Sequence, residues 1–198
     1  MKVIGIAFSD LHLGEYSKFN EDNKRTLNHI RVLYLIKDLC IKYKCPAFFC
    51  GDFMHRPEYI STSLDEIIIE HFEELNRCEE FNIYGISGNH DMQKSNSITS
   101  KSPSHWANLC CRYSFLHNLD FSYHEFDKFR VVGIPYLDHN KGLDGLIKAE
   151  MKEAMINPTI LLLHTDYPGA KDTDNTEVGT VENLNVNLLS KFKLVLIG

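Results

Sequence analysis

The stretch Asn82-Ile83-Tyr84-Gly85-Ile86-Ser87-Gly88-Asn89-His90-Asp91 joins a short apolar run directly to a cluster of polar side chains. An apolar run of this length is typical of a buried strand, and residues 87–91 then form the loop at its end. The loop offers an amide oxygen, an imidazole and a carboxylate within three residues, which suggests a metal site. Because Gly-Asn is also common in ordinary turns, a plain polar turn remains the alternative for this stretch alone.

Three further apolar runs end in the same way. Residues 2–8 lead to Asp10 and His12, residues 47–50 to Asp52, and residues 159–163 to His164. In open α/β sheets, right-handed crossovers bring the carboxyl ends of the strands together, and ligands bind in the crevice outside those ends. The sequence therefore predicts an α/β fold with a site at one edge. Asp10 and His12 lie two residues apart, so in an extended segment both side chains would point to the same side and share an ion.

The types of side chain in this set indicate the chemistry. Imidazole, carboxylate and amide ligands together suit Mn²⁺, Fe or Zn²⁺ better than Ca²⁺, which prefers oxygen ligands alone. Asp52 stands between two clusters, as expected of a carboxylate that bridges two ions about 3.5–4 Å apart. Such a pair activates a water molecule and holds both oxygens of a phosphoryl centre, so hydrolysis of phosphoesters is the leading class of reaction.

Composition and charge narrow the class of protein. A chain of 198 residues that is 43% hydrophobic is expected to form one domain, and a net charge of -6 argues against a broad basic surface for nucleic acid. The six cysteines include no Cys-x-x-Cys pair, and we find neither a signal peptide nor an apolar run long enough for a membrane. We therefore expect no membrane partner and a cytoplasmic location, with the nucleoid or a viral replication site as alternatives.

The order and spacing of Asp10-x-His12, Gly51-Asp52, Gly88-Asn89-His90-Asp91 and His164 resemble the calcineurin-like metallophosphoesterases, from residue 4 to the last residue. Within that superfamily, residues 10–14 and 51–55 look most similar to the SbcD-type DNA repair nucleases, and the Asp-Arg-Gly signature of protein phosphatases is absent after Asp52. The resemblance implies an α/β/β/α sandwich with two mixed β-sheets flanked by helices.

The resemblance also implies a role for each site residue. Asp10, His12 and Asp52 would hold the first metal, and Asp52, Asn89 and His164 the second. His90 would face the scissile phosphate as a proton donor or a stabiliser of charge. His55 matches a position that touches the substrate phosphate, although a plain loop histidine is an equal alternative.

By the same resemblance, the cofactors would be two divalent ions, Mn²⁺ first, with Mg²⁺, Fe or Zn²⁺ as alternatives. The activity would be that of a 3'-5' exonuclease and endonuclease subunit in an SbcCD-like complex of DNA repair or recombination. DNA and an SbcC/Rad-type ATPase would be its partners, and a homodimer is compatible with the resemblance. The alternatives are a generic phosphatase or cyclic-nucleotide phosphodiesterase, and a metal-poor scaffold with the same fold.

One part of the family pattern is not met. A final Gly-His-x-His motif should follow the last strand, but the sequence reaches only Gly198. We therefore expect residues 1–198 to be a C-terminally incomplete phosphoesterase domain without the capping and ATPase-binding segments. Weak activity or none is expected of this fragment.

Overall fold

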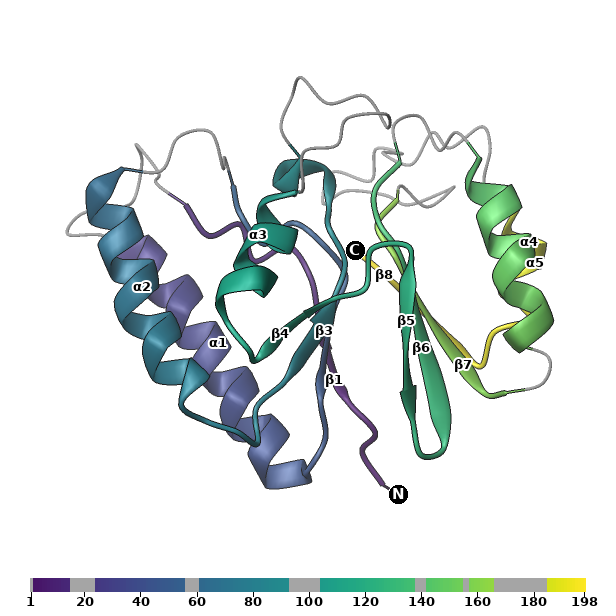
Figure 1. The fold of residues 1–198 in the computed structure, drawn as a ribbon, viewed down its shortest axis with the longest axis horizontal. Helices are drawn as coiled ribbons and strands as arrows, with labels where there is room; N and C mark the ends of the chain where they lie inside the picture. Colours follow the sequence, from purple (N-terminus) through teal and green to yellow (C-terminus); the bar gives the residue numbers. More distant parts are fainter. Residues whose placement is uncertain are drawn as a thin grey trace, which may run out of the picture.

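Two β-sheets lie face to face between two layers of helices (Figure 1). The computed structural model describes residues 2–14, 24–55, 61–92, 104–137, 142–154, 157–165 and 185–198. The predicted α/β class, with two sheets flanked by helices, is confirmed.

The first sheet carries most of the site. Its strands lie in the order β1-β2-β3-β4, and each pairs with its neighbour in parallel. Helices α1, α2 and α3 cover its outer face (Figure 1). The strands are β1 (Ile6–Phe8), β2 (Ala47–Phe49), β3 (Ile83–Gly85) and β4 (Leu116–Asn118), and the helices are α1 (Lys24–Tyr43), α2 (Thr62–Asn76) and α3 (His105–Arg112), with a 3-10 turn, η2, at Asn89–Asp91.

The second sheet has the order β5-β6-β7-β8. Strands β5 and β6 form an antiparallel hairpin, whereas β6, β7 and β8 are parallel. The strands are β5 (Ser122–Phe126), β6 (Phe129–Ile134), β7 (Thr159–Leu163) and β8 (Leu194–Ile197), and the helices outside them are α4 (Leu143–Ala154) and α5 (Val186–Leu189).

The alternation of side chains along the strands produces three layers of core. In β2, Phe49 packs among the helices of the first sheet, while its neighbour Phe48 faces the second sheet. In β7, Ile160 and Leu162 meet Phe48, and Leu161 faces α4 and α5. Successive side chains of a strand point to opposite faces, so strands that are apolar throughout are buried on both sides.

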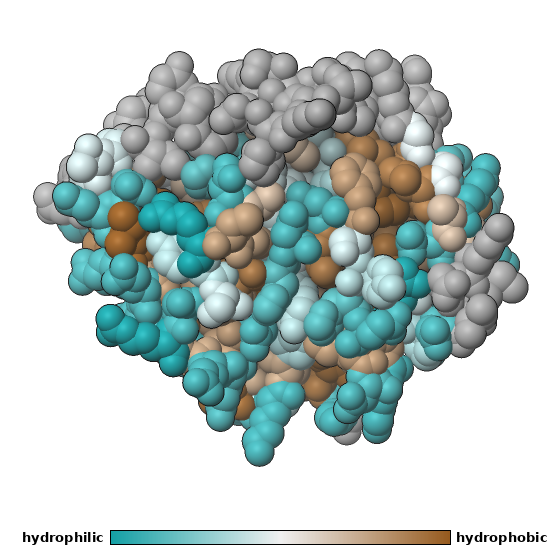
Figure 2. Space-filling model, in the orientation of Figure 1, coloured by the Kyte–Doolittle hydropathy of each residue, from teal (hydrophilic) through white to brown (hydrophobic). Residues whose placement is uncertain are grey.

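The surface follows from the same pattern. On the face shown in Figure 2, hydrophilic residues cover most of the described surface and hydrophobic ones lie between them. None of the described helices has both the length and the apolar character needed to cross a membrane. All six cysteines are free thiols.

The structure corrects two details of the prediction. The first sheet is parallel throughout its described strands, not mixed, because β4 runs parallel to β3 and the chain reverses only in the β5–β6 hairpin. Residues 63–66 have the spacing of a capping box, which predicts that a helix starts at Ser63. Helix α2 is instead capped by Ser61, whose side chain accepts a hydrogen bond from Leu64 N at 3.2 Å, so residues 63–66 lie inside the helix. The apolar residues of 20–44 are close to helical spacing and also predict a helix, which is described from Lys24; residues 20–23 lie outside the described part.

Candidate metal centre

The predicted site residues follow β1, β2, β3 and β7, whose carboxyl ends face the same edge of the molecule (Figure 1). Hydrogen bonds like those of the sheet continue past the ends of β1 and β2. Asp10 N donates to Gly51 O at 3.0 Å, His12 N to Asp52 O at 3.0 Å, and His55 N to Leu13 O at 2.9 Å. The two loops therefore run side by side and place the side chains of residues 10–12 against those of 52–55.

The backbone of these loops is not extended. Asp10, His12 and Asp52 have φ angles of 53°, 46° and 64°, in the left-handed region that residues with a Cβ rarely adopt. The two side chains of the Asp10-x-His12 pair do converge, but a left-handed turn brings them together, so the expected extended segment is wrong. Each such residue costs roughly 1–2 kcal/mol, and backbone strain of this kind concentrates at functional sites.

Asp10, His12 and Asp52 form the first group of potential ligands. His12 Nε2 lies 3.7 Å from Asp10 Oδ1 and 3.7 Å from Asp52 Oδ2, and one ligand atom from each residue lies within 4.8 Å of the others. The His12 ring lowers the pKa of Asp10, and the Asp10 carboxylate raises the pKa of His12. Two carboxylates that attract positive charge to one imidazole suit a divalent cation, which would displace the proton from that ring.

Asp52, Asn89 and His164 form the second group. His164 Nδ1 lies 2.8 Å from the carbonyl oxygen of Cys50, which can only accept, so Nδ1 carries the proton and Nε2 of the neutral ring has a lone pair. That Nε2 lies 2.9 Å from Asn89 Oδ1 and 3.5 Å from Asp52 Oδ1. Three electron-pair donors therefore face one another, which is an arrangement that a cation fits.

The Asn89 amide also has a second orientation. Rotating it would place its N–H group 2.9 Å from His164 Nε2, where it donates. The same three side chains can therefore satisfy one another when no cation is bound. Both groups of residues fit a divalent ion, and the assignment of the five residues as ligands stays a prediction.

Asp91 supports the loops that carry these ligands. Its carboxylate accepts hydrogen bonds from the backbone N–H groups of Gly88 (2.9 Å), Asp52 (3.0 Å), Phe53 (3.0 Å) and Met54 (3.0 Å). Burial raises the pKa of Asp91 to about 6, against the effect of these N–H donors. Both oxygens are engaged with the backbone, so Asp91 ties the β2 loop to the β3 loop.

Gly88 is required for space. The φ of -94° and ψ of -178° at Gly88 are open to any residue, so the conformation of the backbone does not explain this glycine. A Cβ at this position would lie 2.1 Å from Asp52 Oδ1 and 2.4 Å from Asp52 N. The two loops therefore approach so closely that only glycine fits.

Three histidines lie next to the first group. A ring nitrogen from each of His12, His55 and His90 lies within 4.8 Å of the other two. His90 Nδ1 lies 2.9 Å from the carbonyl oxygen of His55 and therefore donates to it. The His55 and His90 rings are nearly parallel, with their centroids 5.8 Å apart. The structure thus brings His55, whose role was left open, to the side of His90.

The sequence did not reveal the Cys50 carbonyl oxygen, because a backbone acceptor has no residue type to mark it. Its position directly before Gly51-Asp52 at the end of a strand is the one signal that could have indicated it.

Comparison with known protein families gives a match over most of the chain. The profile of the calcineurin-like phosphoesterase family matches residues 6–197, and a search of curated proteins found no match. A solved structure from Staphylococcus aureus, named as a 5'-nucleotidase, shares 15% identity and a TM-score of 0.58, over 98% of this chain but 44% of its own. The nuclease MPE of Pseudomonas putida shares 15% identity over 88% of this chain and 67% of its own, with a TM-score of 0.43.

At 15% identity the nucleotidase shows a shared fold alone, and this chain spans less than half of its length. The family match is independent of that likeness, and it covers all five predicted ligands together with His55 and His90. The chain therefore belongs to the calcineurin-like phosphoesterases, a family of metal-dependent hydrolases that act on phosphoester bonds.

Proposed function

We propose that this chain is a nuclease that hydrolyses phosphodiester bonds of DNA with two divalent ions, Mn²⁺ first among them, and that it works as the nuclease subunit of an SbcCD-like complex. The observation that carries the proposal is the pair of imidazoles beside the ligand groups, His55 and His90. A phosphodiester carries two ester groups and has a poor leaving group. Its hydrolysis is therefore helped by a second hydrogen-bond donor to the phosphate as well as by a group that protonates the leaving oxygen.

The ligand residues would hold the ions in two groups, Asp10, His12 and Asp52 for one and Asp52, Asn89 and His164 for the other. Bound there, the ions would supply Lewis acidity and neutralise charge on the phosphoryl oxygens. Asp52 can face both groups because its Oδ1 lies on the side of His164 and its Oδ2 on the side of His12. The backbone N–H of His90 also donates to Asp52 Oδ1 at 2.9 Å and so fixes this carboxylate.

The hydrogen bond from His90 Nδ1 to His55 O supports the proposed role of His90. Because Nδ1 donates to that carbonyl oxygen, Nε2 would be the atom that exchanges a proton with the substrate. The ring of His12 meets that of His90 edge to face at 4.7 Å, so His90 stands directly beside the first group of ligands. His55 would donate to a non-bridging phosphate oxygen.

The proposal is tested by hydrolysis of end-labelled duplex DNA and bis(4-nitrophenyl) phosphate in Mn²⁺, with 4-nitrophenyl phosphate as the monoester control and EDTA as the metal-free control. We expect cleavage of the diesters that EDTA abolishes. Activity on the monoester alone would refute a nuclease and favour the phosphatase alternative.

The role of His90 is tested separately. His90→Asn should abolish turnover while Mn²⁺ stays bound, and His71→Asn, which changes a histidine that contacts Tyr34 between α1 and α2, should keep activity. Loss of Mn²⁺ from His90→Asn would show that His90 is a ligand rather than a proton donor.

A further inference from the structure

Ser87, at the base of the loop that carries Asn89 and His90, is fully buried and bound at every polar group. Its backbone N–H donates to Asp120 Oδ1 at 2.8 Å, and its hydroxyl donates to Asp120 Oδ2 at 2.6 Å. Its carbonyl oxygen accepts from Tyr136 N at 3.0 Å. Asp120, which lies 33 residues further along the chain, therefore binds Ser87 through both carboxylate oxygens.

The direction of these hydrogen bonds is fixed. Because a carboxylate only accepts, the Ser87 hydroxyl must donate its proton to Asp120. The Ser104 hydroxyl must therefore donate to Ser87 Oγ. Ser104 Oγ in turn accepts from Ala107 N at 3.0 Å, as the N-cap of α3. The chain of donors runs from the first turn of α3 to Asp120, and each bond polarises the next.

Burying the carboxylate of Asp120 costs free energy of folding. Burial raises its pKa, and among the described residues no basic side chain forms an ion pair with it. Its stabilisation comes from hydrogen bonds: two from Ser87 and, at its own backbone N–H, one to Asn118 Oδ1 at 3.1 Å. An asparagine of the same shape would remove the charge but could accept on one side only.

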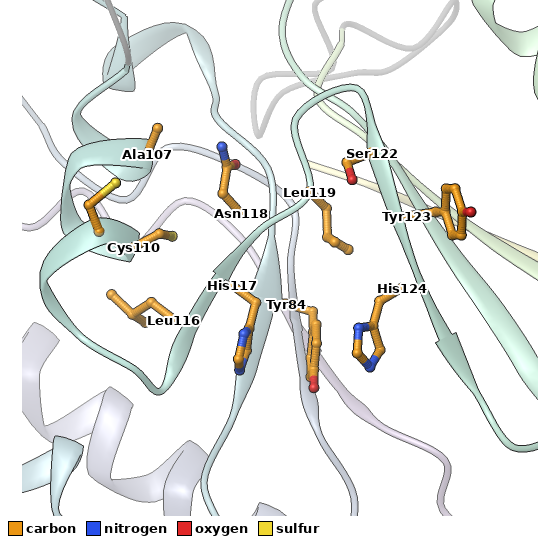
Figure 3. A pocket seen from close by; sticks show the side chains of 11 residues that line it. Tyr84, Ala107, Cys110, Leu116, His117, Asn118, Leu119, Ser122, Tyr123 and His124 are labelled. Carbon is orange, nitrogen blue, oxygen red and sulfur yellow. The ribbon is translucent and has the colours of Figure 1, made fainter.

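The turn between β4 and β5, which contains Asp120, lies beside a cavity. Asn118, Leu119 and Ser122 line a pocket of about 450 Å³ between α3, β4 and β5, and Figure 3 shows these side chains on its upper side, above the rings of Tyr84, His117 and His124. On the side of the cavity, few side chains pack against this turn. The position of the turn relative to β3 therefore depends strongly on the contacts of Asp120 and on the hydrogen bond from Leu119 N to Gly85 O at 2.8 Å.

We infer that Asp120 is a positioning residue of the metal centre: by fixing Ser87 it holds Asn89 against His164 and His90 against His55. The catalytic part of this inference rests on the proposed function, but the structural part does not. Asp91 holds the other end of the same loop, so a carboxylate hydrogen-bonded to the backbone fixes each end of residues 87–91.

The test compares Asp120→Asn with Asp38→Asn, the same chemical change on the exposed surface of α1. Hydrogen–deuterium exchange of the metal-free protein should be at least tenfold faster at residues 87–91 in Asp120→Asn and unchanged in Asp38→Asn. Mn²⁺ titration should show at least tenfold weaker binding of the ion that Asn89 and His164 would hold.

The kinetic signature should match. In Asp120→Asn, kcat should fall at low Mn²⁺ and recover at high Mn²⁺, with KM for the diester unchanged, which a general loss of stability would not produce. Ser87→Ala, which removes the hydroxyl that donates to Asp120 Oδ2 and keeps the carboxylate, should show the same changes at about threefold, and it replaces Asp120→Asn as the test if that variant does not fold. Wild-type exchange rates and Mn²⁺ affinity in the variants would overturn the inference, whereas an inactive wild type with the expected exchange and titration would count against the proposed function alone.

Discussion

A methyl group at position 88 would occupy space that Asp52 already fills. The Cβ of Gly88→Ala would lie 2.1 Å from Asp52 Oδ1, more than 1 Å inside an ordinary contact, and the backbone of Asp52 is also too close to give way freely. The φ angle of -94° is open to alanine, so strain of the backbone does not enter. The substitution therefore isolates the close approach of the two loops.

The size of the effect follows from three contributions. Overpacking costs about 1–3 kcal/mol, and displacing Asp52 from the His90 N–H group removes a charge-assisted hydrogen bond worth about 1.5–3 kcal/mol. The lower entropy of the unfolded chain returns about 0.4–1 kcal/mol. The net loss is about 1.5–5.5 kcal/mol, and its middle value of about 3.5 kcal/mol corresponds to roughly 10 °C in Tm for a protein of this size.

Gly145→Ala is the matched control. Gly145 lies within α4, and a Cβ there would meet nothing within 4 Å, so alanine should stabilise the protein by about 0.5–1 kcal/mol. Urea denaturation measures both variants, and Mn²⁺ titration should show weaker binding in Gly88→Ala alone. Gly88→Ala with wild-type stability and wild-type Mn²⁺ affinity would refute the argument that the loops are in contact.

Three other outcomes can be checked on the same protein. Trp106→Ala should destabilise it by about 3–5 kcal/mol in urea, because the fully buried indole packs on Phe49 and Phe53 and its N–H donates to Gly85 O at 3.1 Å. Burial and the neighbouring His124 lower the pKa of His117 in the folded protein, so below a pH of about 6.5 the unfolded state binds more protons than the folded state does. The midpoint of urea unfolding should therefore fall as the pH is lowered from about 7 to about 5. The fall should be smaller in His117→Gln, which cannot bind this proton. Ellman's reagent should label exposed Cys111 in the native protein, and reach Cys40 and Cys50, whose pKa burial raises to about 12, only after unfolding.

Apolar runs followed by polar residues were enough to predict the strands and the edge where the site lies. Each of Asp10, Asp52 and His164 follows such a run, and the crossover rule then places the three together. The strand-like runs at 121–126 and 129–134 predict a hairpin with its turn at Asp127-Lys128, and β5 and β6 do pair antiparallel on either side of it.

The local geometry was beyond that pattern. The left-handed backbone of Asp10 and His12 was not predicted. Asp and His enter this region more often than most residues, but the residue type alone does not fix it, and hydrogen bonds to the β2 loop about 40 residues away hold it in place. Asp120 was not predicted because its partner Ser87 is distant in sequence and the aspartate follows no periodic pattern. The choice of Ser61 over Ser63 as the helix cap was missed because both fit the residue preference of a cap; in the structure it is Ser61 that accepts from Leu64 N.

The contact of Asp52 with His164 makes the two groups of predicted ligands differ in which parts of the fold they require. Asp10, His12 and Asp52 come from the single unit β1-α1-β2, whereas His164 reaches Asp52 only when the second sheet has packed against the first. During synthesis the first group is complete long before residue 164 has been added. Occupancy of the second group therefore reports that the two sheets have docked, and a cation held there would act as a cross-link between them.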